Sequence, residues 1–173
     1  MASWAAAREA ALAVQPDIFA RHDHGDCVRR TLETVEADCT ARGLRLTALR
    51  RRVLEILLEA HRALGAYDVL ARLAEEGYGS QPPVAYRALD FLVAHGFAHK
   101  LQRLNAFVAC AHPGERHRPA FLICRTCLAV QEAHLDMPSE GIAGAAEAVG
   151  FTVERVVVEA EGLCPECQAA ERA

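Results

Sequence analysis

The stretch FLICRTCLAV, residues 121–130, carries two cysteines three positions apart, Cys124 and Cys127, inside a run that otherwise resembles a hydrophobic strand. A matching pair, Cys164 and Cys167, follows in GLCPECQ near the end of the chain. Two CxxC turns can supply four thiolates, the number of ligands that zinc takes in a closed, tetrahedral structural site. The sequence therefore predicts a structural zinc ion that fastens the C-terminal segment to this strand.

The residues around the cysteines predict a small α/β unit, residues 105–173. Residues 120–135 read as strand, turn and strand, and the β-branched run at 151–162 predicts a further strand. A helix is expected between them at 138–149. We expect the strands of this unit to be antiparallel.

The preceding segment, residues 22–104, reads as a series of compact helices followed by a β-hairpin near Asn105. The helices expected here span residues 26–42, 48–61, 67–77 and 82–96. In the last of them, four apolar residues recur at helical spacing and should face a core: Ala85, Ala88, Leu89 and Leu92. This order is typical of a winged helix-turn-helix, in which the helix at 82–95 would enter the major groove of DNA. The fold class is thus α+β, with residues 1–21 as a weakly structured extension.

Charge is unevenly distributed along the chain. The net charge is −4, but residues 1–104 hold 14 basic and 13 acidic residues, whereas residues 105–173 hold 5 and 10. Five arginines and no acid fall within RGLRLTALRRR, residues 42–52. A local basic patch on a nearly neutral unit is compatible with DNA binding through one face. The alternative is a solvated, arginine-rich helix face.

A second set of possible metal ligands lies around the boundary between the two units. It comprises His99, Cys110, His112, His117 and Glu132. Zinc accepts such a mixed set of nitrogen, sulfur and oxygen ligands readily. One ion held by both His99 and Glu132 would tie the two units together, although spacing alone does not bring these residues into contact.

Other features narrow the class of protein. No apolar run approaches the roughly 18 residues of a membrane span, and Arg8 and Glu9 interrupt the alanine-rich start, so we expect neither membrane association nor a signal peptide. We expect a cytoplasmic protein, in which paired CxxC motifs serve metal or redox chemistry. No nucleophile–base pair, phosphate loop or pair of catalytic carboxylates is recognisable, which predicts a non-enzyme without a small-molecule substrate. His22, His24 and Cys27 form either an extra metal site or a polar capping segment.

Several segments together resemble the ferric uptake regulator (Fur) family, and most closely its zinc uptake regulator branch. They extend over residues 39–167 and are RLTALRRRVLEIL, GAYDVLARL, PPVAYRALDFLVAHGFAHK, NAFVAC, FLICRTCLAVQE and GLCPEC. The sequence departs from the family pattern in having Ala48 in place of a proline, Val84 in place of a threonine and Leu128 in place of a glycine after the first CxxC.

The resemblance implies a homodimeric, zinc-responsive repressor that binds double-stranded operator DNA and controls zinc-uptake genes. It implies an N-terminal winged helix, a C-terminal dimerisation unit and two zinc ions per chain. The implied ligands of the structural zinc are Cys124, Cys127, Cys164 and Cys167. The implied ligands of the sensory zinc are His99, Cys110, His117 and Glu132. Tyr67 and Arg87 match residues that contact DNA, and we add as candidates Tyr86, Arg50, Arg51 and Arg52.

Two other interpretations stay open from the sequence. The first is a Fur-type sensor of iron or peroxide, but those branches carry a histidine-rich stretch before the first CxxC, and HPGERHRPAF here lacks it. The second is a zinc-ribbon metallochaperone or redox protein without DNA binding. The arginine-rich segment together with AYRALDFL argues against the latter.

Overall fold

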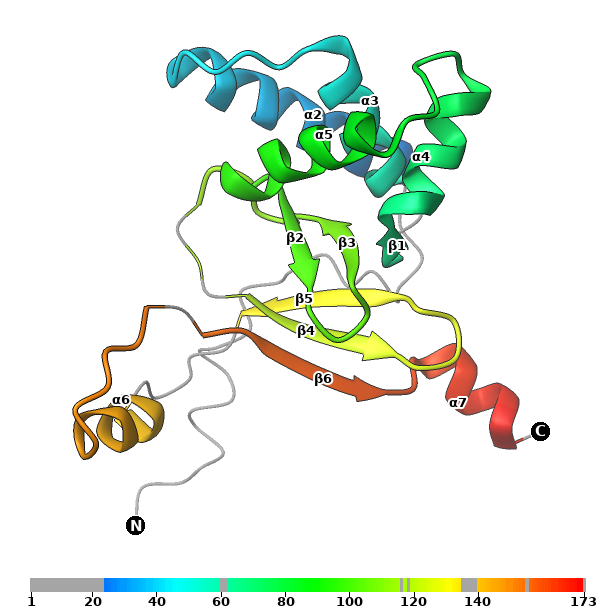
Figure 1. Ribbon diagram of the computed structural model, residues 1–173. Helices are drawn as coiled ribbons and strands as arrows, with labels where there is room; N and C mark the ends of the chain where they lie inside the picture. Colours follow the sequence, from blue (N-terminus) through cyan, green and yellow to red (C-terminus); the bar gives the residue numbers. More distant parts are fainter. Residues whose placement is uncertain are drawn as a thin grey trace.

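A computed structural model of the chain describes residues 24–59, 62–115, 117, 119–134, 140–154 and 156–172 (Figure 1). The predicted extension at residues 1–21 lies outside this range. So do His22 and the side chain of His24, two of the three residues of the possible N-terminal metal site.

Four helices form the N-terminal part of the structure, and their positions confirm the predicted ones, with ends that differ by up to three residues. They are α2 (His24–Ala41), α3 (Ala48–Leu58), α4 (Ala66–Glu75) and α5 (Pro82–Ala94). Thr47 caps α3 by accepting a hydrogen bond from the N–H of Arg50 at 3.3 Å. Gly96 follows α5 with φ +77°, a left-handed conformation that suits glycine at a helix end. The apolar face of α5 is buried as expected, with Leu89 and Leu92 fully inaccessible.

The wing is an antiparallel hairpin of β2 (Ala98–Leu101) and β3 (Ala106–Ala109), and its turn ends at Asn105. A two-residue strand, β1 (Leu64–Gly65), pairs with the other edge of β3 and was not predicted. Because β2 pairs with β3, the hairpin spans the predicted boundary between residues 104 and 105. We therefore draw the boundary after Ala109 and call residues 24–109 the winged-helix unit.

The C-terminal sheet consists of β4 (Pro119–Cys124), β5 (Val130–His134) and β6 (Val158–Gly162), in the order β5-β4-β6. β4 and β5 are antiparallel, but β6 runs parallel to β4, so the prediction of uniformly antiparallel strands was wrong. The physical reason is a crossover: after β5 the chain passes through α6 (Glu140–Glu147) and returns to the starting end of β4 (Figure 1).

The predicted strand at 151–162 is also shorter than expected. Only its last five residues pair, because β4 offers partners from Ala120, opposite Val158, to Cys124, opposite Gly162. A short helix that the sequence did not predict, α7 (Pro165–Arg172), follows the sheet.

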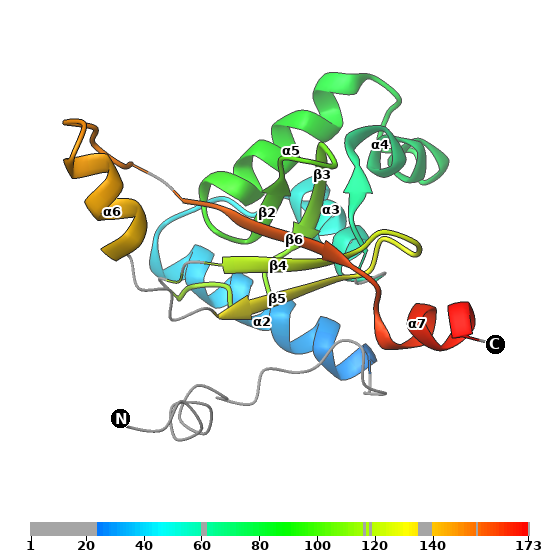
Figure 2. The same ribbon diagram turned by 90° about the horizontal axis from the view of Figure 1, so that it is seen from below.

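The hairpin of the winged-helix unit lies on one face of the C-terminal sheet, as both views show (Figures 1 and 2). A shared apolar cluster joins the two; its buried members are Ala63, Leu101, Ala106, Val108, Phe121, Ile123 and Val130. Leu122, on the opposite face of β4, is 44% exposed. The observed combination of helices and two small sheets confirms the α+β class. Within the part of the chain described, no helix is both long and apolar enough to cross a membrane.

Candidate metal centres and DNA-facing helix

The first cluster consists of the four cysteines of the two CxxC motifs. Cys124 ends β4, Cys127 lies in the turn after it, and Cys164 and Cys167 lie at the start of α7. Their sulfur atoms all lie within 4.8 Å of one another. The sulfurs of Cys127 and Cys164 are 3.7 Å apart, close to the roughly 3.8 Å that a tetrahedral ion with Zn–S bonds of about 2.3 Å requires. The cluster therefore fits zinc in both chemistry and spacing.

The thiols of Cys124 and Cys167 differ in acidity. Burial would raise the pKa of Cys124, but hydrogen bonds from the backbone N–H groups of Cys127, Cys164 and Thr126 outweigh it and lower that pKa to about 6. The hydrogen bond with Cys164, together with burial, raises the pKa of Cys167 to about 12. The Cys124 thiolate is thus prepared by the backbone, whereas Cys167 releases its proton only against a bound cation.

Leu128 explains why a glycine is usual after the first CxxC. Its φ is +60°, in the left-handed region, which costs a residue with a Cβ roughly 1–2 kcal/mol. The conformation lets the N–H of Leu128 donate to Cys124 O at 3.0 Å and its carbonyl accept from Ala63 N–H at 3.1 Å. The turn that carries the cysteines therefore also contacts the winged-helix unit.

The second cluster takes its ligands from both parts of the molecule. His99 lies on β2, Cys110 directly after β3, His117 in the loop before β4, and Glu132 on β5. One ligand atom from each lies within 4.8 Å of all the others. Cys110 Sγ is 3.5 Å from His117 Nε2, about the separation that one tetrahedral zinc imposes between a sulfur and a nitrogen ligand. The mixed donor set and the spacing both fit zinc.

Glu132 is the buried carboxylate of the described part, with 5% of its surface exposed. Burial would raise its pKa, but the hydrogen bond and charge of His99 outweigh this and lower it. Its Oε1 lies 2.6 Å from His117 Nε2 and 3.5 Å from His99 Nε2, and its Oε2 accepts from Ala111 N–H at 2.9 Å. Burial, and secondarily the charge of Glu132, raises the pKa of Cys110 far above its usual value. A cation is needed to hold this thiol and this carboxylate as anions together.

His112 does not join the four ligands. Its ring centroid lies 6.0 Å from that of His117, so it stands next to the cluster.

The residues predicted to contact DNA from α4 and α5 are exposed. Tyr67, in the first turn of α4, is 69% exposed, and Tyr86 on α5 is 38% exposed. Arg87 is also exposed, on the side of α5 away from the buried Ala88 and Leu89. This face is therefore open to a partner.

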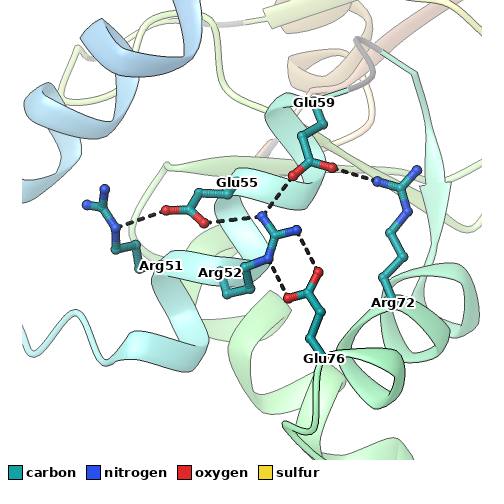
Figure 3. A network of polar contacts seen from close by, with 6 residues as sticks. All are labelled: Arg51, Arg52, Glu55, Glu59, Arg72 and Glu76. Carbon is teal, nitrogen blue, oxygen red and sulfur yellow. Dashed lines mark hydrogen bonds and ion pairs between the residues drawn. The ribbon is translucent and has the colours of Figure 1, made fainter. Parts of the chain in front are cut away.

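The three consecutive arginines of α3 have intramolecular partners that the sequence analysis missed. Arg50 lies 3.7 Å from the ring centroid of Phe91 on α5, and Arg51 pairs with Glu36 on α2. Arg52 binds Glu76 at the end of α4 through two hydrogen bonds of 2.6 and 2.7 Å (Figure 3). Successive side chains point about 100° apart around a helix, so neighbouring arginines reach three different helices.

Arg52 lies at the centre of this network. Glu55 and Glu59, which follow Arg52 by three and seven residues, accept hydrogen bonds from it at 3.2 and 2.7 Å. Glu59 also accepts a hydrogen bond from Arg72 (Figure 3). The hydrogen bond to Arg52 lowers the pKa of Glu76. The spacing of Arg52, Glu55 and Glu59 on one helix face was visible in the sequence, whereas Glu76 could not have been found from it. Contact of Arg52 with a phosphate would require these bonds to break.

Comparisons with known proteins agree with this geometry. No protein-family model matches the chain. The chain is 37% identical over 137 residues to the zinc uptake regulation protein of Escherichia coli. The aligned residues make up 79% of this chain and 80% of that protein. A solved structure of a zinc uptake regulator complexed with zinc and DNA aligns at 35% identity with a TM-score of 0.79, over 84% of this chain and 98% of its own. A structure of holo XcZur aligns at 40% identity with a TM-score of 0.72, over 81% and 98%. With its helices, its paired CxxC motifs and its interdomain cluster, the chain belongs to the zinc uptake regulator branch of the Fur family.

Proposed function

We propose that this protein is a zinc-responsive, DNA-binding repressor that controls zinc-uptake genes. One observation carries the proposal: the second cluster takes His99 from the winged-helix unit and Glu132 from the C-terminal sheet. A metal ion that binds ligands from both units stabilises the relative orientation in which those ligands meet. The relatives, zinc uptake regulation proteins by name, support the assignment to regulation rather than to catalysis.

The chain's own residues connect the cluster to the DNA-facing surface. A zinc ion bound there would supply a positive charge that attracts all four ligands. It would therefore favour the arrangement in which the four ligands meet. His99 lies on β2, which follows α5 after the turn at Gly96. A fixed position of His99 therefore fixes the direction of α5, and with it the exposed Tyr86 and Arg87.

We further propose a homodimer with two zinc ions per chain, one in each cluster. The exposed Leu122 on the outer face of the C-terminal sheet supports a second copy at that face, because an apolar side chain there gains from being covered. In such a dimer two α5 helices would enter successive major grooves of operator DNA. This role places the protein in the cytoplasm, and it requires neither a catalytic site nor a small-molecule substrate.

The test is operator binding measured against buffered free zinc, with iron and manganese as controls. We expect zinc to strengthen binding to a zinc-uptake promoter by about 5- to 150-fold, the range typical of allosteric coupling. Activation by iron or manganese instead would favour an iron or peroxide sensor. Absence of specific DNA binding with any metal would favour a metallochaperone.

A further inference from the structure

The tip of the wing is bound by a carboxylate from the C-terminal sheet. Glu159, on β6, accepts a hydrogen bond from Gln102 N–H at 2.7 Å through Oε1 and from Arg103 N–H at 3.2 Å through Oε2. Both N–H groups belong to the turn between β2 and β3. One side chain thus bonds two consecutive backbone amides across 56 and 57 residues of sequence.

The chemistry of the contact is specific. Consecutive backbone N–H groups in a turn form a concave site for an anion, and the two oxygens of a carboxylate can serve one group each. Hydrogen bonds to a charged acceptor are stronger than those between neutral groups. Arg103 adds an ion pair at 2.7 Å with Glu161, two residues further along β6.

The register of the sheet explains why Glu159 faces the wing. It is paired with Phe121 of β4, and Glu161 is paired with Ile123. Paired residues on neighbouring strands point to the same face of a sheet. Phe121 and Ile123 belong to the apolar cluster shared with the hairpin, so both glutamates lie on the hairpin side.

The hairpin is therefore held at both ends. At its open end, His99 and Cys110 contribute to the second metal cluster, and at its turn, Gln102 and Arg103 are held by Glu159. Apolar packing between these ends is not directional, whereas the two hydrogen bonds of Glu159 fix the position of the turn on the sheet.

We infer that Glu159 is a positioning residue that holds the winged-helix unit in its DNA-binding orientation from the end of the wing opposite the zinc cluster. The inference rests on the proposed function. It assigns to Glu159 no contact with metal or DNA. Its effect on DNA binding is transmitted through the hairpin.

The direct test is amide hydrogen exchange in the full-length, zinc-loaded protein. In Glu159→Ala, exchange at Gln102 and Arg103 should accelerate about tenfold or more, because both amides lose a charged acceptor. Glu159→Gln, which keeps one acceptor oxygen, should restore part of the protection. Glu161→Gln is the matched control: it removes only an ion pair to the exposed side chain of Arg103 and should leave both amides protected.

The functional arm measures zinc content and operator affinity for the same variants. Glu159→Ala should keep the zinc content of the wild type, bind the operator about tenfold more weakly at saturating zinc, and show a broader solution-scattering distance distribution. Glu161→Gln should stay within about twofold of wild type. Unchanged exchange at Gln102 and Arg103, or fast exchange with wild-type operator affinity and scattering, would overturn the inference. If the wild type itself showed no zinc-dependent DNA binding, the proposed function would fail, and the exchange and scattering measurements would still decide the role of Glu159.

Discussion

Glu132 shows at the scale of one residue why the second cluster is suited to sensing. A carboxylate that is 5% exposed loses most of its hydration, and in this protein two histidines and one backbone N–H compensate for that loss. Cys110, fully buried beside it, stays protonated until a cation arrives because burial raises its pKa. The occupied and empty states of such a site would differ in charge and hydrogen bonding, as the proposed sensory role requires.

Removing single ligands of this cluster should separate sensing from folding. Cys110→Ser should fold, dimerise and retain about one zinc per chain, because the four other cysteines form a separate site. It should lose the second, exchangeable zinc, since the thiolate is the ligand that best favours zinc over harder cations. Zinc per purified chain and operator binding against free zinc measure both effects.

His99→Ala is the sharper companion variant, because His99 is the histidine ligand from the winged-helix unit. Zinc-stimulated operator binding should be weakened at zinc concentrations that saturate the wild type. Cys39→Ala, on α2 and outside both clusters, is the control. Equal zinc stimulation in the wild type and both ligand variants would contradict the sensory assignment and direct attention to His112.

At the scale of elements, α3 and α5 differ in what their polar side chains contact. α3 directs three consecutive arginines to α5, α2 and α4, and so holds the helices together. α5 buries Leu89 and Leu92 and exposes Tyr86 and Arg87. An arginine-rich segment can therefore serve packing, while Arg87 on α5 stays exposed as the candidate for DNA recognition.

Arg52→Gln should lower stability more than it affects DNA recognition. Arg52 is 22% exposed and bridges α3 to the end of α4, so we expect a loss of about 1 kcal/mol, or about 2–4 °C in the melting temperature. Arg29→Gln, which removes an exposed pair on α2, should change little. An unchanged melting temperature, combined with weaker binding to all DNA and a salt dependence reduced by about one phosphate contact, would instead identify Arg52 as a phosphate ligand.

Arg87→Ala should reduce discrimination between the operator and random DNA. An arginine that reaches guanine in the major groove contributes about 1–3 kcal/mol of specificity, whereas it adds less to binding of arbitrary sequences. Competition of labelled operator with operator and with random duplex measures the difference. A uniform loss of affinity for every DNA sequence would show that Arg87 contacts the sugar–phosphate backbone of the DNA and not a base edge.

At the scale of the whole molecule, the hairpin joins the helices of the winged-helix unit to the C-terminal sheet through apolar packing, the second cluster and Glu159. The opposite face of that sheet carries Leu122. The two faces thus differ: one packs against the winged-helix unit of the same chain, and the other is the face at which we propose a second copy.

Leu122→Glu should give a monomer at micromolar concentration, because a carboxylate would be buried at the proposed dimer face without a partner. Sedimentation equilibrium measures this directly. Tyr78→Glu, which changes a similarly exposed residue in the winged-helix unit, should remain dimeric. A dimeric Leu122→Glu would place the interface elsewhere.

The sequence predicted what local spacing can encode. The helical repeat of apolar residues predicted α5 and its buried face. The spacing of Cys124 and Cys127 predicted a turn whose two thiols can bind one metal ion. The composition of the second cluster came from resemblance, since His99 and Glu132 are 33 positions apart and only folding brings them together.

What could not be predicted depends on long-range geometry. The parallel pairing of β6 follows from a crossover, and the residues of β6 alone carry no preference for it. The bonds of Glu76 to Arg52 and of Glu159 to the wing join polar side chains to partners distant in the sequence, and no periodicity marks them. The left-handed conformation of Leu128 was indicated in the sequence only by the departure from the family pattern, in which a glycine follows the first CxxC.

The docked wing has a consequence for which part of the double helix is read. A β-hairpin that is free of other contacts can lie against DNA, including in its narrow groove. Here its turn is bound to Glu159 and its apolar side chains are covered by the C-terminal sheet. We therefore expect the proposed recognition of DNA to rely on α5 in the wide groove. Drugs that fill the narrow groove of A·T tracts should not displace the protein by competition, and methylation of guanine N7 should.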